Sequence, residues 1–142
     1  MAGINMARVF GGGIVAGLVM NVIDAVVNGA LLGARWAEET KRLGIEMTPT
    51  LESQSLTGWI VYDFVGGILI LWLYAAIRPR YGAGAKTAVI SGLAFWFITH
   101  MAFAAWVFNR LYSLGIVGAS TLGGLVSALL GALAGCALYK EA

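Results

Sequence analysis

The chain has 142 residues, of which 60% are hydrophobic and only 11% carry charge. An average soluble domain is about half apolar and about one-quarter charged, and a small domain has a proportionally larger surface to cover with polar groups. This composition argues against a soluble enzyme, a nucleic-acid-binding domain and a disordered tail. The net charge of +2 is also too small to indicate a nucleic-acid partner.

Four long stretches of the chain hold almost no charge, namely residues 9–34, 53–77, 87–109 and 111–139. A helix needs about 20 mostly apolar residues to cross a hydrocarbon core about 30 Å thick, and backbone polar groups in lipid must be satisfied within the segment. We therefore predict an all-α integral membrane protein, with a single domain over residues 1–142 in which four transmembrane helices form a bundle. The predicted spans are residues 9–33, 56–77, 87–109 and 115–138.

Four crossings place both termini and the loop at residues 78–86 on the same side of the membrane. Five basic residues lie on that side and four on the other, and short cytoplasmic loops are enriched in Lys and Arg. We therefore expect both termini in the cytoplasm. The architecture is similar to that of small four-span bacterial membrane proteins, which suggests the bacterial cytoplasmic membrane as the location.

One connection, at residues 34–55, is long and lies on the outer side. Residues 36–43 are predicted to form a helix with Glu38 and Arg42 at the favourable i,i+4 spacing, and Gly44 is a typical C-terminal stop. This helix either lies on the membrane surface, where it would be free to bind a partner, or simply continues the first span beyond the bilayer.

The next helix is predicted to begin after Thr48, which caps it, with Pro49 at its first position. Aromatic side chains near the ends of the spans are expected to lie at the two membrane interfaces. At the outer interface these are Trp36, Trp59, Tyr62, Trp106 and Tyr112, and at the inner interface they are Trp72, Tyr74, Tyr81 and Tyr139.

Glycine occurs 20 times, about twice the usual share of about 7%. In the fourth span small residues recur at intervals of four, at Gly123, Ser127, Gly131 and Gly135. The first span has a similar pair at Gly13 and Gly17. Faces of small residues let helix backbones approach closely in a membrane, so these positions are predicted to mediate helix packing, within one chain or between copies.

Three ionisable side chains, Asp24, Asp63 and His100, lie within the predicted spans, where such groups usually face a bundle interior, a cavity or a partner. Counted from the outer ends of their spans at about 1.5 Å per residue, all three are roughly 10–15 Å deep. We therefore expect them to share one level in the outer half of the membrane. Asn21 and Asn28 lie three and four residues from Asp24, which puts the three polar residues of the first span on one helix face.

This intramembrane polar cluster has three interpretations. It could hold a divalent metal ion, since carboxylates and imidazole suit several such ions, but no ligand pair at helical spacing supports a metal site. An aspartate could exchange a proton during transport, because carboxylate and histidine relays serve that purpose in membranes. The simplest interpretation is a hydrogen-bonded network that fixes the register of the helices.

His100 allows a further interpretation, because it lies among aromatic residues in the third span. A histidine in such surroundings could be an axial ligand to a haem or another tetrapyrrole. The chain has one histidine, so a bis-histidine site would require a second subunit. No cofactor is therefore predicted, with a tetrapyrrole or a divalent metal at His100 left as an alternative.

No motif of a known catalytic site is present, and the connection at residues 34–55, with about 20 residues, is too short to form a catalytic domain. We therefore expect a non-enzymatic membrane protein that acts as a structural or accessory subunit of a membrane assembly. Its partners would be lipid and either further copies or other membrane subunits, with no nucleic acid. The alternatives are a small oligomeric carrier or channel that uses Asp24, Asp63 and His100, and a tetrapyrrole-binding subunit.

Overall fold

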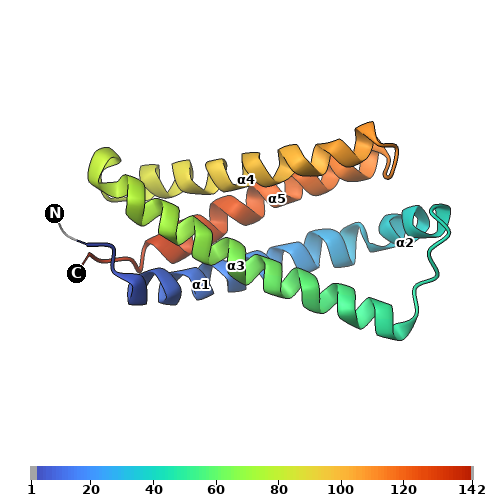
Figure 1. The fold of residues 1–142 in the computed structure, drawn as a ribbon, viewed down its shortest axis with the longest axis horizontal. Coiled ribbons are helices and arrows are strands. Elements are labelled where there is room, and N and C mark those ends of the chain that lie inside the picture. The colour runs from blue at the N-terminus through green and yellow to red at the C-terminus, as the bar shows by residue number, and fades with distance from the viewer. Residues whose placement is uncertain (1–2, 142) are drawn as a thin grey trace.

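A computed structural model describes residues 3–141. Within this range the chain is helical and contains no strands. The elements are α1 (Met6–Asp24), the π-helix η1 (Ala25–Leu31), α2 (Gly33–Arg42), α3 (Pro49–Tyr81), α4 (Ala85–Phe108) and α5 (Leu114–Cys136). Figure 1 shows α4 and α5 running side by side, α3 crossing α1, and both termini at the same end of the molecule.

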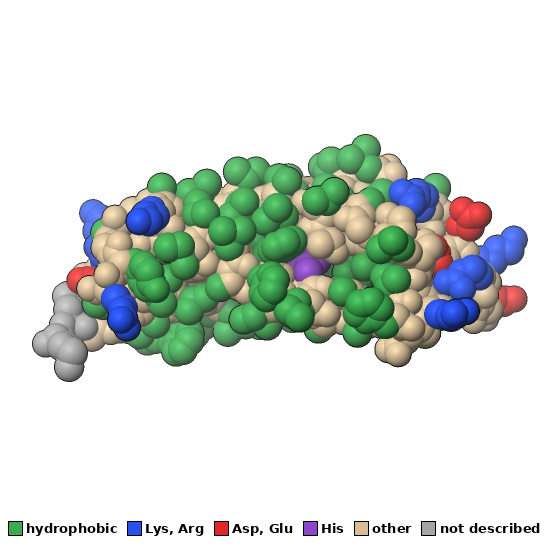
Figure 2. All heavy atoms as spheres, turned by 90° about the horizontal axis from the view of Figure 1, so that it is seen from above, with side chains coloured by type: hydrophobic (Ala, Val, Ile, Leu, Met, Phe, Trp, Pro, Cys, Tyr) green, Lys and Arg blue, Asp and Glu red, His purple; other side chains and the backbone are tan. Residues whose placement is uncertain are grey.

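Four helical segments are long and apolar enough to cross a membrane: Met6–Leu31, Pro49–Tyr81, Ala85–Phe108 and Leu114–Cys136. This confirms the prediction of four membrane-capable helices. Figure 2 shows hydrophobic side chains over the middle of the molecule and charged side chains at its two ends. The charge-poor stretches of the sequence thus become one continuous apolar zone.

The second span is longer than predicted, because α3 begins at Pro49 and not at residue 56. The Thr48 hydroxyl accepts a hydrogen bond from the Leu51 backbone nitrogen at 3.3 Å, and proline occupies the first helical position, where its missing N–H is not needed. The cap and the helix start were predicted, and the predicted span 56–77 lies within the longer helix, because the polar residues that follow the cap continue the same helix.

Helices α1 and α3 pack backbone to backbone through glycine. A methyl group on Gly13 would lie 2.6 Å from the Ile68 Cα, and one on Gly17 would lie 2.7 Å from the Phe64 Cα. On the opposite side of the contact, Gly67 faces the backbone of both α1 glycines. Such close approach is how packing is gained where lipid offers no hydrophobic drive.

A second face of α1 packs against α5. A methyl group on Gly131 would lie 3.0 Å from the Ala16 carbonyl oxygen, and one on Gly135 would meet the Gly12 carbonyl oxygen at 2.5 Å. Farther along α5, Gly123 lies against the Val27 side chain. The small-residue faces of α1 and α5 are therefore occupied by neighbours in the same chain.

At the end that holds the termini, two tyrosines differ from the prediction of an interfacial belt. Tyr74 and Tyr139 are only 3% and 5% exposed, and their rings meet edge to face at 5.8 Å. The Tyr74 hydroxyl accepts a hydrogen bond from the Gly84 nitrogen at 3.1 Å, and the Tyr139 hydroxyl accepts one from the Asn5 nitrogen at 3.1 Å. These hydroxyl groups bind backbone of the same chain, which is why the rings are buried.

At the opposite end, α2 is held against the connection between α4 and α5. Arg42 donates to the Glu39 carboxylate at 2.8 Å and to the Leu111 carbonyl oxygen at 2.6 Å. Glu39 in turn accepts a hydrogen bond from the Ser113 nitrogen at 3.3 Å. The predicted pair of Glu38 with Arg42 is therefore wrong, because Glu39 at i,i+3 is the residue that lies between Arg42 and Ser113.

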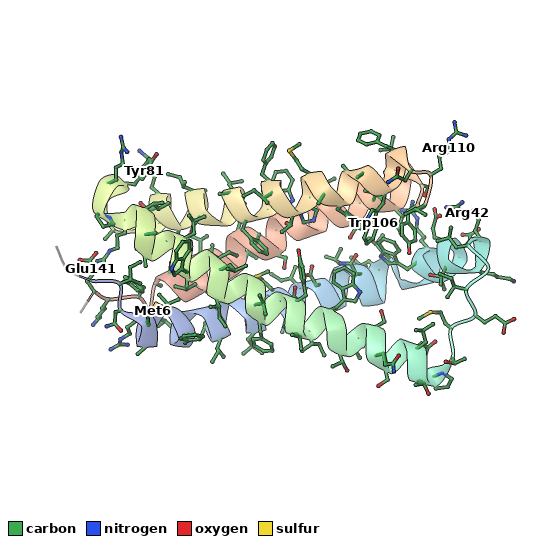
Figure 3. The ribbon with its side chains drawn as sticks, in the orientation of Figure 1. Met6, Arg42, Tyr81, Trp106, Arg110 and Glu141 are labelled. Atoms are coloured by element: carbon green, nitrogen blue, oxygen red, sulfur yellow. The ribbon has the colours of Figure 1, made fainter. Side chains whose placement is uncertain are left out.

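Aromatic rings complete this docking. The Trp36 ring of α2 lies 5.3 Å from Tyr112, edge to face, and 6.3 Å from Phe103. Trp106 joins the group at 4.7 Å from Phe103, and Figure 3 shows it pointing from α4 toward α2, while Arg110 points away from the bundle. Trp36 thus packs within the chain, as a continuation of the first span would require.

Candidate functional site

Each of the four long helical segments contributes one polar side chain to a common layer. Asp24 comes from α1, Asp63 from α3, His100 from α4 and Ser127 from α5. Ser127 donates a hydrogen bond to Asp24 Oδ2 at 3.2 Å. Gly124, three residues earlier in α5, lies against the His100 ring. Asp24 and His100 therefore contact α5 within a single turn of that helix.

The two acidic residues come from neighbouring helices, Asp24 from the end of α1 and Asp63 from α3. Asp63 is only 4% exposed, whereas Asp24 is half-buried and accepts the Ser127 hydroxyl. The Asp63 backbone lies against α1, since a methyl group on Gly17 would lie 3.0 Å from the Asp63 carbonyl oxygen. The layer therefore holds two carboxyl groups that are shielded from solvent.

Asp63 marks the point where α3 leaves the rest of the molecule. Every residue of α3 from Pro49 to Tyr62 is exposed, and Asp63 is the first buried residue of the helix. Below it, Gly66 and Gly67 are buried, with Gly66 against the Phe95 ring. Asp63 thus marks the fork at which the exposed outer part of α3 leaves its neighbours, and Figure 1 shows α3 diverging from α4 toward the N-terminal end of α3.

The two asparagines of the first span reach different helices. The Asn21 amide donates to the Gly17 carbonyl oxygen at 2.9 Å and to the Ile60 carbonyl oxygen of α3 at 3.3 Å. Asn28 Oδ1 accepts from the Ser120 hydroxyl of α5 at 2.8 Å and from the Trp36 ring nitrogen at 3.2 Å. Asn21 therefore ties α1 to α3, and Asn28 ties η1 to α5 and α2.

A π-helix separates the backbone of Asp24 from that of the later part of the first span. Its backbone hydrogen bonds run from residue i to i+5, so its turn is wider than an α-helical turn. Asn28 lies four residues after Asp24, and the two side chains bind Ser120 and Ser127, which are two turns apart on α5. Both polar residues of this segment therefore face α5.

His100 belongs to the layer but makes no ion pair with the acids, since the salt bridges among residues 3–141 do not include it. Its Nδ1 lies 3.0 Å from the Trp96 carbonyl oxygen, and because a carbonyl only accepts, Nδ1 carries the hydrogen of the neutral ring. Nε2 then faces the Gly124 backbone. In Figure 2 the single histidine is visible in the middle of the apolar zone.

The site offers oxygen ligands and one imidazole, but these are not gathered around one point. In the part of the chain that the structure describes, no three His, Cys, Asp or Glu side chains come close enough together to hold a metal ion. His100 stacks with Trp96 at 5.8 Å and meets the Phe103 edge at 6.0 Å. What the two carboxyl groups can do chemically is take up and release protons.

Sequence reasoning missed several partners in this site. Ser127 was predicted as a packing residue and not as the donor to Asp24, and neither Ser120 nor Gly124 was singled out. One signal was present: Ser120 and Ser127 lie seven residues apart, on the same helix face. That spacing matches two polar positions on a neighbouring helix, but it does not say which helix.

No protein-family model matches the chain, and comparison with curated proteins and with solved structures found no match. The class of protein therefore follows from the structure alone: an all-helical chain with four membrane-capable helices and a layer of polar side chains between them.

Proposed function

We propose that this chain is an integral membrane protein that exchanges a proton at the Asp24–Asp63 pair and acts as a small proton-linked carrier. The four apolar segments would cross the bilayer, with both termini in the cytoplasm of a bacterial cell. The apolar surface between two charged ends supports the insertion (Figure 2). The function is a binding and exchange activity, and no enzymatic step is part of it.

The observation that carries this proposal is the burial of two acidic side chains from neighbouring helices: Asp63 of α3 is 4% exposed, and Asp24 of α1 is half-buried against Ser127. An ionised aspartate at the centre of a membrane helix costs about 2.5–3.5 kcal/mol, and two adjacent carboxylates repel each other. Lys and Arg are absent from residues 9–34 and 53–77, so these segments supply no basic group. With no basic group in these segments, a proton shared by the two carboxyl groups would be what neutralises them.

A purely structural network would not need acids at these positions. Asn21 and Asn28 already cross-link the helices through neutral amide groups. An amide in place of either aspartate would keep a hydrogen bond to Ser127 or to the opposite side chain without any charge. The carboxyl pair adds one property that amides lack, which is the ability to take up and release a proton.

Infrared spectroscopy of the protein in lipid vesicles tests the proposal. The wild-type chain should show the carbonyl band of a protonated carboxyl group that disappears as the pH is raised. Either Asp24→Asn or Asp63→Asn should remove this band, whereas Glu39→Gln, outside the apolar segments, should leave it unchanged. Vesicles with an imposed pH gradient should also take up protons faster with the wild-type chain than with Asp63→Asn. A spectrum or a proton flux that is the same in both would overturn the proposal.

A second function is favoured by a separate observation: the outer part of α3, Pro49–Tyr62, is exposed along its whole length. This segment supports the alternative that the chain is a structural or accessory subunit, bound to further copies or to other membrane proteins. Purification in mild detergent tests it. An assembly larger than one chain is expected, and a monomer without companions would count against this role.

A further inference from the structure

We propose that the end of the bundle that holds both termini binds the phosphate group of an anionic phospholipid, at a site built around Arg78 near the end of α3. In the structure the Glu141 carboxylate lies beside the Arg78 guanidinium, and the lipid phosphate would take its place. This inference rests on the proposed insertion into a membrane and is independent of the proton exchange at Asp24 and Asp63.

The neighbours of Arg78 fix its side chain but leave part of its hydrogen-bonding capacity unused. The side chain is only 20% exposed, and the guanidinium lies over the Tyr139 ring, 5.5 Å from the ring centre. Nη1 lies 3.1 Å from Glu141 Oε1, yet this buried nitrogen has no aligned hydrogen-bond acceptor among residues 3–141. Because a buried donor without an acceptor is costly, an oxygen placed in line with Nη1 would be bound favourably.

A cavity adjoins the ion pair. Its volume is about 210 Å³, far more than a single water molecule needs. Tyr139 and Glu141, which both contact the Arg78 guanidinium, form the polar part of its wall. The remaining wall is mostly apolar and consists of Gly3, Ile4, Ala75, Ala76 and Pro79. A ligand with a charged group and an apolar part fits such a wall, and a phospholipid has both.

The charges at this end of the molecule favour an anion. One acidic residue, Glu141, stands against five basic residues, namely Arg8, Arg78, Arg80, Lys86 and Lys140. Basic residues next to a membrane span attract anionic headgroups. Arg78 is the one member of this group that is not exposed, and a planar guanidinium can bind two phosphate oxygens at once. The exposed basic residues would attract the lipid, and Arg78 would position its phosphate.

Glu141 is held weakly enough for a phosphate to displace it. Its side chain is 40% exposed, and ion pairs in contact with solvent contribute little to stability. Figure 3 shows Glu141 at the same end of the molecule as Met6, where α1 begins. A released carboxylate would therefore turn into the surrounding water, while the phosphate takes over the contact with Arg78.

A lipid titration of the full chain tests this proposal. The protein in a neutral detergent is mixed with phosphatidylglycerol, and native mass spectrometry measures the fraction of chains with one bound lipid. Phosphatidylcholine, whose phosphate is neutralised by its own choline group, should bind about tenfold more weakly. Equal binding of the two lipids would overturn an anion site. Displacement of phosphatidylglycerol by an equal concentration of inorganic phosphate would overturn the lipid as the ligand.

Three variants locate the site. Arg78→Gln and Arg78→Lys should each weaken the binding of phosphatidylglycerol about tenfold, since lysine restores the charge but not the two parallel hydrogen bonds. Arg80→Gln, at an exposed position two residues away, is the matched control and should weaken binding by only about twofold. Equal losses for Arg78→Gln and Arg80→Gln would leave only non-specific attraction and overturn the site.

Glu141→Gln provides an independent test at an exposed position, which keeps the proposal testable if the Arg78 variants do not fold. It should strengthen the binding of phosphatidylglycerol, because the competing carboxylate is removed. Unchanged or weaker binding would overturn the displacement of Glu141 by the phosphate. Lipid binding and the infrared band of the carboxyl groups are measured separately, so either proposal can fail while the other stands.

Discussion

A methyl group placed on Gly67 of α3 would lie 2.5 Å from the backbone nitrogen of Gly17 in α1. This distance is shorter than any real carbon contact, so the two helices approach each other as closely as their backbones allow. The contact is one turn from Asp63, on the inner side of the acidic pair. It therefore fixes the crossing of α1 with α3 close to Asp63.

Substitution of this contact should destabilise the fold. We expect Gly17→Ala or Gly67→Ala to lower the free energy of unfolding by about 1–3 kcal/mol, because an added methyl group forces well-packed backbones apart. Thermal or denaturant unfolding in detergent, followed by circular dichroism, measures the change.

Gly11 provides the matched control, since it lies on the same helix but a methyl group there would meet no atom within 4 Å. Gly11→Ala should be neutral or slightly stabilising, because alanine favours a helix over glycine by up to about 1 kcal/mol. Equal losses for Gly11→Ala and Gly17→Ala would show that the close contact is not what stabilises this helix pair.

The same pair of helices shows what a sequence can and cannot predict. The spacing of Gly13 and Gly17 identified a packing face, and the lack of charge located four long helices. Periodicity does not say which helix meets which face, so the backbone contact with Gly67 could not be predicted. The fork at Asp63 was also out of reach, because residues 49–62 and the inner part of α3 belong to one uninterrupted helix.

The sequence predicts a depth for the candidate site but not the partners of its residues. Counting residues from the outer ends of the spans predicts a similar depth for Asp24, Asp63 and His100. The hydrogen bonds could not be derived, because the period of a helix does not say which helices are its neighbours. The π-helix at Ala25–Leu31 was also out of reach, since counting at α-helical spacing carries no information about a change of turn.

The position of His100 depends on the absence of a side chain at Gly124. A methyl group there would overlap the imidazole, and its distance from Cε1 would be 2.6 Å. We expect Gly124→Ala to displace the ring and to lower the free energy of unfolding by about 1–3 kcal/mol. The loss should largely vanish in the His100→Ala background, where the methyl group finds free space.

A double-mutant cycle measures this coupling directly. Gly118→Ala serves as the control in α5, since a methyl group at Gly118 would meet no atom within 4 Å, and it should behave alike in both backgrounds. Additive effects of Gly124→Ala and His100→Ala would contradict the contact.

The hydrogen bond between Asn28 and Ser120 should stabilise the π-helix against α5. Its donor and acceptor are 2.8 Å apart, and side-chain hydrogen bonds between membrane helices contribute about 0.6 kcal/mol on average and up to about 1.7 kcal/mol. We therefore expect a coupling energy in this range between Asn28→Ala and Ser120→Ala, measured by unfolding. A coupling near zero would show that η1 is held by other contacts, such as the one between Asn28 and Trp36.

The docking of α2 should be lost in acid, because Glu39 is a hydrogen-bond acceptor at its centre. The hydrogen bond from Ser113, and next the one from Arg42, lower the pKa of Glu39 below its ordinary value of 4.5. A carboxylate with a lowered pKa stabilises the docked state above its ordinary pKa, and this contribution disappears as the pH falls through the lowered value. We therefore expect α2 to stay docked at neutral pH and to become mobile only as the pH falls below the ordinary pKa of Glu39. The mobility of a spin label on Lys41→Cys reports the change.

Two glutamine variants identify the group that titrates. Glu39→Gln should make α2 mobile at all pH values, whereas Glu38→Gln, at the exposed neighbouring position, should leave the wild-type transition in place. A transition that survives in Glu39→Gln would assign it to another group.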